Sequence, residues 1–196
     1  FAQKLGAPVC TSMMGLTSLP YDSPLNLGLV GMHGTATANM AVGRCDLLIA
    51  VGARFSYRVA GNRLKFAADA KVLHIDIDRA EISKNIPVSL SLVGDAGPCM
   101  ERLAARLPEQ AESDWLHEVL RHKALNALPD SESTGGEVNP RDVVRLLRVA
   151  GGDDLLVATD VGQHQMLVAQ YYPFSKPRSF LSSCGLGTMG YGMGAA

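Results

Sequence analysis

The stretch CDLLIAVGARF, residues 45–55, contains five consecutive apolar residues that end at a glycine, and AKVLHIDIDRAEI, residues 70–82, is a second candidate strand. Residues 47–51 are apolar at every position, so both faces of the strand they form need cover, which is typical of the interior of a parallel sheet. In the second stretch, polar residues begin only near the end, where histidine and aspartates alternate with isoleucines from 74 to 78. Both stretches are therefore predicted to be interior strands of an α/β domain.

Short apolar runs alternate with helical patterns over the first half of the chain, which indicates parallel α/β units. Strands are expected at about 8–12, 46–51, 71–77 and 89–93. A helix of small residues, capped by Thr35 or Thr37, is expected after the glycine-rich GLVGMHG. The helical pattern of CMERLAARL then predicts a closing helix and the end of a first domain, 1–107.

The composition becomes polar at 108–138, which is predicted to be a linker with one helix around 115–128 followed by the exposed segment PDSESTGGE. Asn139 and Pro140 then begin a helix with Val143, Leu146, Leu147 and Ala150 on one face. A second α/β unit is predicted at 139–196, with strands before TDVGQHQM and at RSFLSSCG. Because the chain starts at Phe and stops inside the glycine-rich GYGMGAA, we expect it to be a piece of a longer protein.

Composition and charge exclude several classes of protein. Lysine plus arginine, 18, nearly balance aspartate plus glutamate, 19, so the sequence offers no overall basic field for nucleic acid. No apolar stretch approaches the roughly 20 residues that cross a bilayer, and no signal peptide is visible, so a cytoplasmic protein is expected. Four cysteines stand singly, which favours reduced core thiols over disulfides or a zinc site: Cys10, Cys45, Cys99 and Cys184. No metal site is predicted within the chain.

Several predicted strands of the first domain end in glycine or acid, at VGARF, HIDID and VGD, and GLVGMHG precedes a helix. Parallel strands end at a common edge, where nucleotides bind. There Asp76 could accept a ribose or ribityl hydroxyl, Arg54 and Arg58 could pair with phosphate, and Asp95 could hold a polar group. The same residues are equally compatible with solvation of the sheet edge.

A second glycine-rich region follows the strand before TDVGQHQM, residues 159–166. Its glutamines and His164 can donate hydrogen bonds to diphosphate oxygens without a full positive charge. SSCGLGTMGYGMG places Met189 among five glycines, where the backbone can approach a ligand closely and the methionine can act as an apolar prop.

These motifs together resemble the large catalytic subunit of acetohydroxyacid (acetolactate) synthase, a family of thiamine-diphosphate enzymes. The resemblance runs through GLVGMHGTATAN, DLLIAVGARF, AKVLHIDIDRAEISKN, VGD, TDVGQHQM and SSCGLGTMGYG. It implies a Rossmann-like central domain, DHS-like and NAD/FAD-binding, with a six-stranded parallel sheet. The first part of a second α/β domain that binds thiamine diphosphate would follow it.

Site residues carried over by motif fall into three groups. FAD contacts would be Ser12, Met13, Met14, Val30, Gly31, Met32, His33, Gly52, Arg54, Arg58, Asp76, Ile77, Asp95 and Ala96. Gln163 and His164 would hold the diphosphate of thiamine diphosphate, and Gly187 and Met189 would support its thiazolium ring. Arg58 and Leu167 would lie on the substrate side.

The resemblance implies carboligation of pyruvate with a second 2-keto acid, pyruvate or 2-ketobutyrate, with loss of CO2, in branched-chain amino-acid synthesis. It also implies a homodimer or homotetramer with a small regulatory subunit. The activating glutamate is expected on a domain before Phe1 and the Mg2+ motif beyond Ala196, so the isolated chain is expected to be inactive. The family usually has aspartate at Tyr57, tryptophan at Leu167 and proline at Gly194, and its preference for 2-ketobutyrate is therefore not carried over.

Two other interpretations stay open on sequence alone. A non-catalytic dinucleotide- or FAD-binding module fits the first domain, but it leaves the second glycine-rich region unexplained. Another thiamine-diphosphate carboligase or oxidase fits both domains, and its reaction products would distinguish it.

Overall fold

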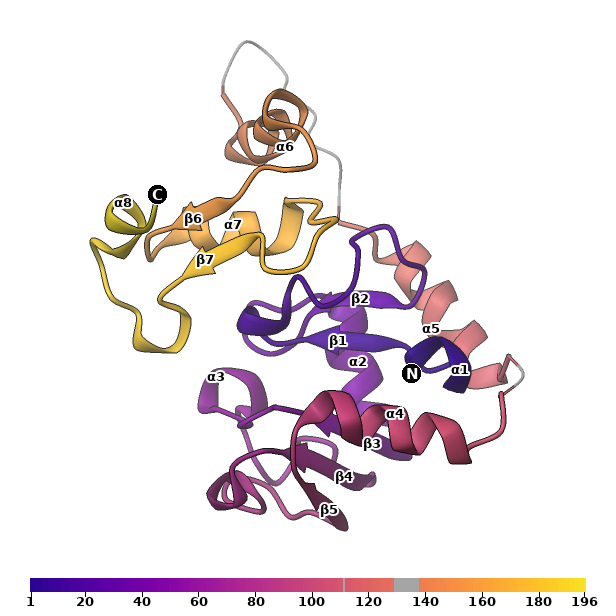
Figure 1. The fold of residues 1–196 in the computed structure, drawn as a ribbon. Coiled ribbons are helices and arrows are strands. Elements are labelled where there is room, and N and C mark those ends of the chain that lie inside the picture. The colour runs from indigo at the N-terminus through magenta and orange to yellow at the C-terminus, as the bar shows by residue number, and fades with distance from the viewer. Residues whose placement is uncertain (111, 129–137) are drawn as a thin grey trace.

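The computed structural model describes residues 1–110, 112–128 and 138–196, and its helices and strands form two lobes (Figure 1). The first lobe contains α1 (Ala2–Leu5), β1 (Val9–Thr11), η1 (Met13–Gly15), β2 (Asn26–Leu29), α2 (Ala36–Arg44), β3 (Leu47–Val51), α3 (Tyr57–Ala60), β4 (Lys71–Asp76), η2 (Arg79–Glu81), β5 (Leu90–Val93), α4 (Ala96–Arg106) and α5 (Asp114–Leu125). The second contains α6 (Pro140–Gly151), β6 (Val157–Thr159), α7 (Gln163–Tyr171), β7 (Phe180–Ser182), η3 (Cys184–Leu186) and α8 (Tyr191–Ala195).

All strand pairs in the described residues are parallel, and they form three separate groups, β1-β2, β3-β4-β5 and β6-β7. The α/β class is therefore confirmed, whereas the six-stranded sheet predicted for the first domain is wrong, because its described part has five strands in two groups. β1 contributes only three residues, and its register to β2 shifts between Val9 and Cys10. This leaves β1 little regular backbone with which to pair a second neighbour.

The predicted strand positions agree with β1, β3, β4 and β5 to within one or two residues. β4 is central, as expected, but β3 lies at the edge of its hydrogen-bonded group. The sequence did not indicate β2, because Gly28, which has φ of 83°, falls within its four residues and suggests a turn. The segment PDSESTGGE, 129–137, lies outside the described residues, so the predicted linker stays a prediction.

Side-chain caps begin the main helices. The Thr35 hydroxyl accepts a hydrogen bond from the Ala38 amide at 3.0 Å, so Thr35 rather than Thr37 caps α2. Asn139 caps α6 by accepting from the Arg141 amide at 3.0 Å, with Pro140 in the first turn as predicted. These caps fix where the helices start relative to the strands that precede them.

The buried face of α6 differs from the prediction. Val144 is the buried residue of this helix, and it packs in a cluster with Val168 and Tyr171 of α7. All four residues of the predicted apolar face are exposed instead, Val143, Leu146, Leu147 and Ala150. Helical spacing identifies an apolar stripe but not which neighbour covers it, and here α7 covers the adjacent stripe.

The helix α5, predicted within the linker, packs on the first lobe (Figure 1). Its Val119 is fully buried against Leu27 and Ala38, and Trp115 lies against the same cluster. Full burial of a valine-sized side chain stabilises by roughly 1.5–3 kcal/mol. The helix α5 is therefore anchored to α2 rather than free.

Direct contacts join the two lobes. Leu16, Leu29 and Ala169 form one buried cluster across them. The Gln170 side-chain amide donates to the His33 carbonyl oxygen at 2.7 Å, and the Tyr21 amide donates to the Phe174 carbonyl oxygen at 2.8 Å. These contacts set α7 beside the loop that follows β2.

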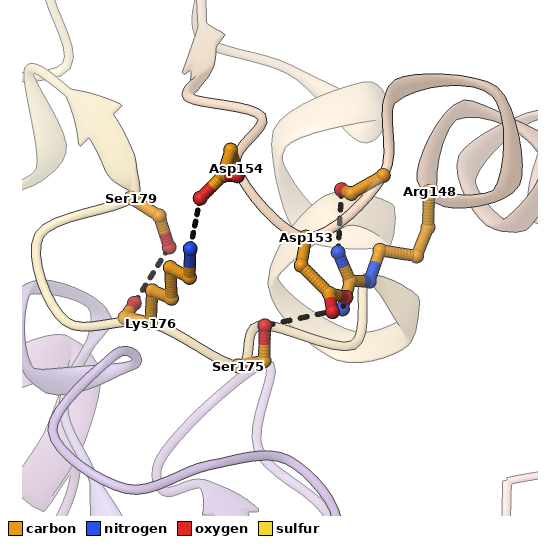
Figure 2. A network of polar contacts seen from close by, with 7 residues as sticks. Arg148, Asp153, Asp154, Ser175, Lys176 and Ser179 are labelled. Carbon is orange, nitrogen blue, oxygen red and sulfur yellow. Dashed lines mark hydrogen bonds and ion pairs between the residues drawn. The ribbon is translucent and has the colours of Figure 1, made fainter.

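A polar network holds the opposite side of the second lobe, before β6 and β7 (Figure 2). Arg148 of α6 pairs with Asp153 and donates to the Ser175 hydroxyl, and Lys176 pairs with Asp154. The network lies at the amino ends of the strands, away from the glycine-rich loops, and we assign it a structural role.

The four cysteines are free and only partly buried, so the predicted core position is not confirmed, and their reduced state stays a prediction. Burial raises the pKa of the Cys10 thiol to about 11. No helix in the described part of the chain is both long and apolar enough to cross a membrane.

Candidate functional site

The carboxyl ends of β3, β4 and β5 carry polar and glycine residues that the local backbone holds in place. The Gly52 amide donates to the Ile75 carbonyl oxygen at 2.8 Å, and the Gly94 amide donates to the Asp76 carbonyl oxygen at 2.9 Å. Asp95 caps α4 by accepting from the Gly97 amide at 2.9 Å. Parallel pairing therefore brings the ends of the three strands to one edge, as the sequence predicted for its strand-end residues.

The loop after β2 reaches this edge through a close backbone approach. The Met32 amide donates to the Arg58 carbonyl oxygen at 2.8 Å. Gly31 has φ of 103°, and a Cβ atom there would lie 2.5 Å from the same oxygen, so only glycine fits. Asn39 of α2 holds Gly31 from the other side, accepting from its amide at 2.8 Å and donating to its oxygen at 3.0 Å.

A cavity of about 320 Å³ opens beside this contact, between α2 and the segment from α3 to residue 67. Gly31, Met32, Asn39, Arg58 and Lys65 are among the residues that line it. Its size is at the lower end for sites that take small molecules. The Asn39 contribution was missed from the sequence, where only its position in a small-residue helix could have suggested it.

The end of β4 places a buried acid at the site. Asp76 is 7% exposed, and its Oδ1 accepts from the Asp78 amide at 2.9 Å. Ile77, the next residue, is 74% exposed. The Asp76 carboxylate is therefore held by the backbone turn that follows it, next to an exposed apolar side chain at this edge of the sheet.

Large apolar side chains around this edge lack cover from the described chain. Four of them are more than half exposed: Met14, Met32, Tyr57 and Ile77. Ser12, Met13 and Met14 follow β1, and in the described residues no hydrogen bond joins them to the loops after β3 or β4. The structure thus brings together the loops at 30–33, 52–58 and 76–77 at the carboxyl edge. Residues 12–14 end a different strand and are not hydrogen-bonded to the loops after β3 or β4 in the described residues.

The second site is built on the end of β6. Gly162, with φ of 151°, precedes α7, and no side chain caps this helix. Gln163 and His164 are exposed in its first turn. A nine-residue helix with an uncapped amino end presents free N–H groups and the positive end of its dipole, which favours an anion.

Gln165 has a different role from its two neighbours. It is buried, and its side-chain amide donates to the Ser182 hydroxyl of β7 at 2.6 Å. The sequence predicts that all three polar side chains face a ligand, whereas in the structure Gln165 fixes α7 on β7.

Asp160 joins this turn to the glycine-rich segment. Its carboxylate accepts from the Val161 amide and from the Gly190 amide, the latter at 2.8 Å. These backbone hydrogen bonds, that from Val161 first, hold the pKa of Asp160 below its usual value. A Cβ at Gly192 would lie 2.6 Å from the Asp160 nitrogen, so α8 also requires glycine at this approach.

The loop between β7 and α8 presents Gly187, with φ of 60°, and the exposed side chains of Leu186 and Met189, and Met193 of α8 is exposed as well. A Cβ at Gly185 would lie 3.7 Å from the Arg54 guanidinium, so this loop reaches the first lobe. The two candidate sites are therefore neighbours.

Leu167 and metal binding need separate mention. Leu167 is half-buried and packs against the core cluster of the second lobe. Within residues 1–110, 112–128 and 138–196, no group of three histidine, cysteine or acidic side chains could hold a metal ion.

Comparison with known proteins identifies related chains over both lobes. Residues 1–103 match the family model of the central domain of thiamine pyrophosphate enzymes, and residues 160–196 match that of their C-terminal, thiamine-pyrophosphate-binding domain.

The whole chain is 42% identical over 202 residues to the acetolactate synthase large subunit of Haemophilus influenzae and 44% identical over 204 residues to the probable acetolactate synthase large subunit of Methanocaldococcus jannaschii. It covers 35% and 34% of those relatives, respectively. Acetolactate synthase isozyme 3 large subunit of Escherichia coli is 40% identical over 99% of the chain and 35% of the relative. The chain thus spans about a third of the length of the curated relatives it matches.

Proposed function

Because this chain belongs to the thiamine pyrophosphate enzyme family, whose central-domain model matches more than half of it, we propose that it is part of the catalytic subunit of an acetolactate synthase. The observation that carries the proposal is the 40–44% identity to acetolactate synthase large subunits along essentially the whole chain, across both lobes. The domain boundaries 1–107, 108–138 and 139–196 are part of this proposal.

The amino end of α7 fits the diphosphate of thiamine diphosphate. Its free N–H groups and the exposed Gln163 and His164 would bind the anionic oxygens without a full positive charge beside them. Gly187 and the exposed Met189 would support the ring part of the cofactor, since a positive φ and an uncovered methionine suit close approach and apolar contact. Mg2+ would join the diphosphate through ligands outside this chain.

The carboxyl edge of the first lobe fits FAD in a Rossmann-like arrangement. Asp76 would accept a sugar or ribityl hydroxyl, Arg54 would meet phosphate, and the close approach at Gly31 would bring backbone amides to the cofactor. The uncovered Met14, Met32 and Ile77 would cover its flat ring systems.

The proposed reaction joins pyruvate to a second 2-keto acid, pyruvate or 2-ketobutyrate, with loss of CO2. Bound thiamine diphosphate supplies the electron sink for decarboxylation, and the protein supplies position and exclusion of water. Arg58, exposed in α3, would pair with a substrate carboxylate, and Leu167 would act on the substrate side from its half-buried position.

Assembly into a homodimer or homotetramer, a small regulatory subunit and a cytoplasmic location complete the proposal. The large-subunit names of the relatives support the regulatory partner.

The test is product analysis with the full-length protein, pyruvate, thiamine diphosphate, Mg2+ and FAD. We expect acetolactate from pyruvate alone, detected by its acid conversion to acetoin, and acetohydroxybutyrate in addition when 2-ketobutyrate is also present. Acetaldehyde or acetyl phosphate as the sole product would overturn the synthase and favour a decarboxylase or an oxidase. The isolated chain of 196 residues is expected to form no acetolactate under the same conditions.

A further inference from the structure

His74 lies in the middle of β4 and is fully buried, with 0% of its surface exposed. Neither ring nitrogen has a hydrogen-bond partner in the described part of the chain. The ring packs edge-on against Phe55, with 5.1 Å between the ring centroids. An apolar side chain would satisfy this packing equally well, so packing does not account for an imidazole here.

Leaving a buried polar group unpaired costs about 1–3 kcal/mol. Buried side-chain nitrogens are nearly always paired, and an exception calls for a specific reason. Without a ligand, the protein therefore loses this free energy of stabilisation at His74. A function that uses the imidazole after a ligand binds would account for it.

The carboxylate of Asp76, two residues along the same face of the strand, lies close to the ring. His74 Nε2 lies 3.6 Å from Asp76 Oδ2, too far for a normal hydrogen bond. The other oxygen, Oδ1, already accepts from the Asp78 amide at 2.9 Å. A shift of about 0.7 Å, from 3.6 Å to an ordinary hydrogen-bond length, would hold the carboxylate on both sides.

We propose that His74 is a positioning residue for ligand binding: its ring donates from Nε2 to Asp76 Oδ2 once a sugar or polyol hydroxyl engages that carboxylate. The inference rests on the proposed cofactor function of this edge and adds a residue to it. Hydrogen bonds that are long in a ligand-free site commonly shorten when the ligand is bound. The ring of His74 is unpaired before the ligand binds and hydrogen-bonded afterwards, and this gain makes ligand binding tighter.

The inference predicts effects of opposite sign in the two states. Replacement of His74 by leucine or phenylalanine removes the unpaired nitrogens, so the ligand-free protein should melt about 2–4 °C higher. The same replacements remove the donor to Asp76, so the dissociation constant for FAD should rise about 5–30-fold. Replacement of a residue with a purely structural role would not raise the melting temperature of the ligand-free protein and weaken FAD binding at the same time.

The experiment measures both quantities in the full-length protein, by thermal unfolding without FAD and by FAD titration. His74→Leu matches the imidazole in volume, and His74→Phe keeps an aromatic ring against Phe55 in case leucine packs poorly. His74→Gln keeps an N–H donor near the Nε2 position and should restore FAD affinity to within about 3-fold of wild type. His117→Leu is the matched control, because His117 is exposed and pairs with Glu112, and it should change neither quantity.

The possible outcomes separate this inference from the function beneath it. If the wild-type protein binds FAD and the leucine and phenylalanine variants bind it equally well, His74 has no positioning role, while the FAD site stands. A lower melting temperature of both variants without FAD would also overturn the inference, since it would show that the imidazole is already paired. If the wild-type protein does not bind FAD, both the cofactor proposal and the inference fail.

Discussion

Replacement of Gly31 by alanine tests the contact that joins the loop after β2 to α3. The added Cβ would lie 2.5 Å from the Arg58 carbonyl oxygen and 2.8 Å from the Val59 Cα atom. Both are backbone atoms, so no side-chain rotation can relieve the overlap. The residue also has φ of 103°, which alanine rarely adopts.

Two costs add at this position. A left-handed backbone conformation costs a non-glycine residue roughly 1–2 kcal/mol, and forced overlap with packed atoms typically costs about 1–3 kcal/mol. We expect Gly31→Ala to lower the free energy of unfolding by about 2–5 kcal/mol, unless the loop moves away from α3. In that case the Met32–Arg58 hydrogen bond would be lost and FAD affinity would fall instead.

Two glycines of the same lobe are matched controls. Gly61 also has a positive φ, 54°, but a Cβ there would meet no atom within 4 Å, so Gly61→Ala should cost only the roughly 1–2 kcal/mol of strain. Gly43 lies in α2 without a positive φ and with open space around it, so Gly43→Ala should stabilise by up to about 0.5–1 kcal/mol.

The assay is urea unfolding followed by the fluorescence of Trp115, the single tryptophan of the chain, which packs against the core of the first lobe. The expected order of midpoints is Gly43→Ala, wild type, Gly61→Ala and Gly31→Ala, from highest to lowest. A Gly31→Ala midpoint equal to that of Gly61→Ala, with unchanged FAD binding, would show that the close approach to Arg58 contributes nothing.

Three further predictions concern the second lobe and the thiols. Hydrogen bonds lower the pKa of Asp160, so the stability that its carboxylate contributes should be present above about pH 4, the pKa of an unfolded aspartate, and be lost as the pH falls through the lower folded pKa. Asp160→Asn should therefore remove this acid dependence from urea unfolding measured between about pH 6 and pH 3, and an unchanged dependence would contradict the prediction. Gln165→Leu should destabilise by about 1–3 kcal/mol, because the Ser182 hydroxyl loses its buried donor, and a double-mutant cycle with Ser182→Ala should show coupling; additive effects would argue against the bond. Because burial raises the pKa of Cys10 to about 11, iodoacetamide at pH 8 should label it far more slowly in the folded than in the unfolded protein, as peptide mass analysis would measure, and equal rates would disprove its burial.

Several features of the fold followed directly from local sequence. The consecutive apolar residues of 47–51 and the delayed polar residues of 71–76 predicted β3 and β4 nearly to their ends. Asn139 and Pro140 marked the start of α6, because capping and the fixed φ of proline act within a few residues. The collection of strand ends at one edge followed from parallel pairing, which the alternation of strands and helices required.

Only the tertiary structure decided which elements pair and which faces are covered. Pattern alone could not show that β1 and β2 stay apart from β3 as a separate pair, that Val144 rather than its neighbours faces the core, or that Gln165 holds β7 instead of a ligand. The unpaired ring of His74 was equally invisible, because a missing partner is a property of everything that surrounds it. Apolar spacing and caps act through neighbours in sequence, whereas pairing, burial and close approach depend on residues far apart in the chain, and only the folded chain brings these together.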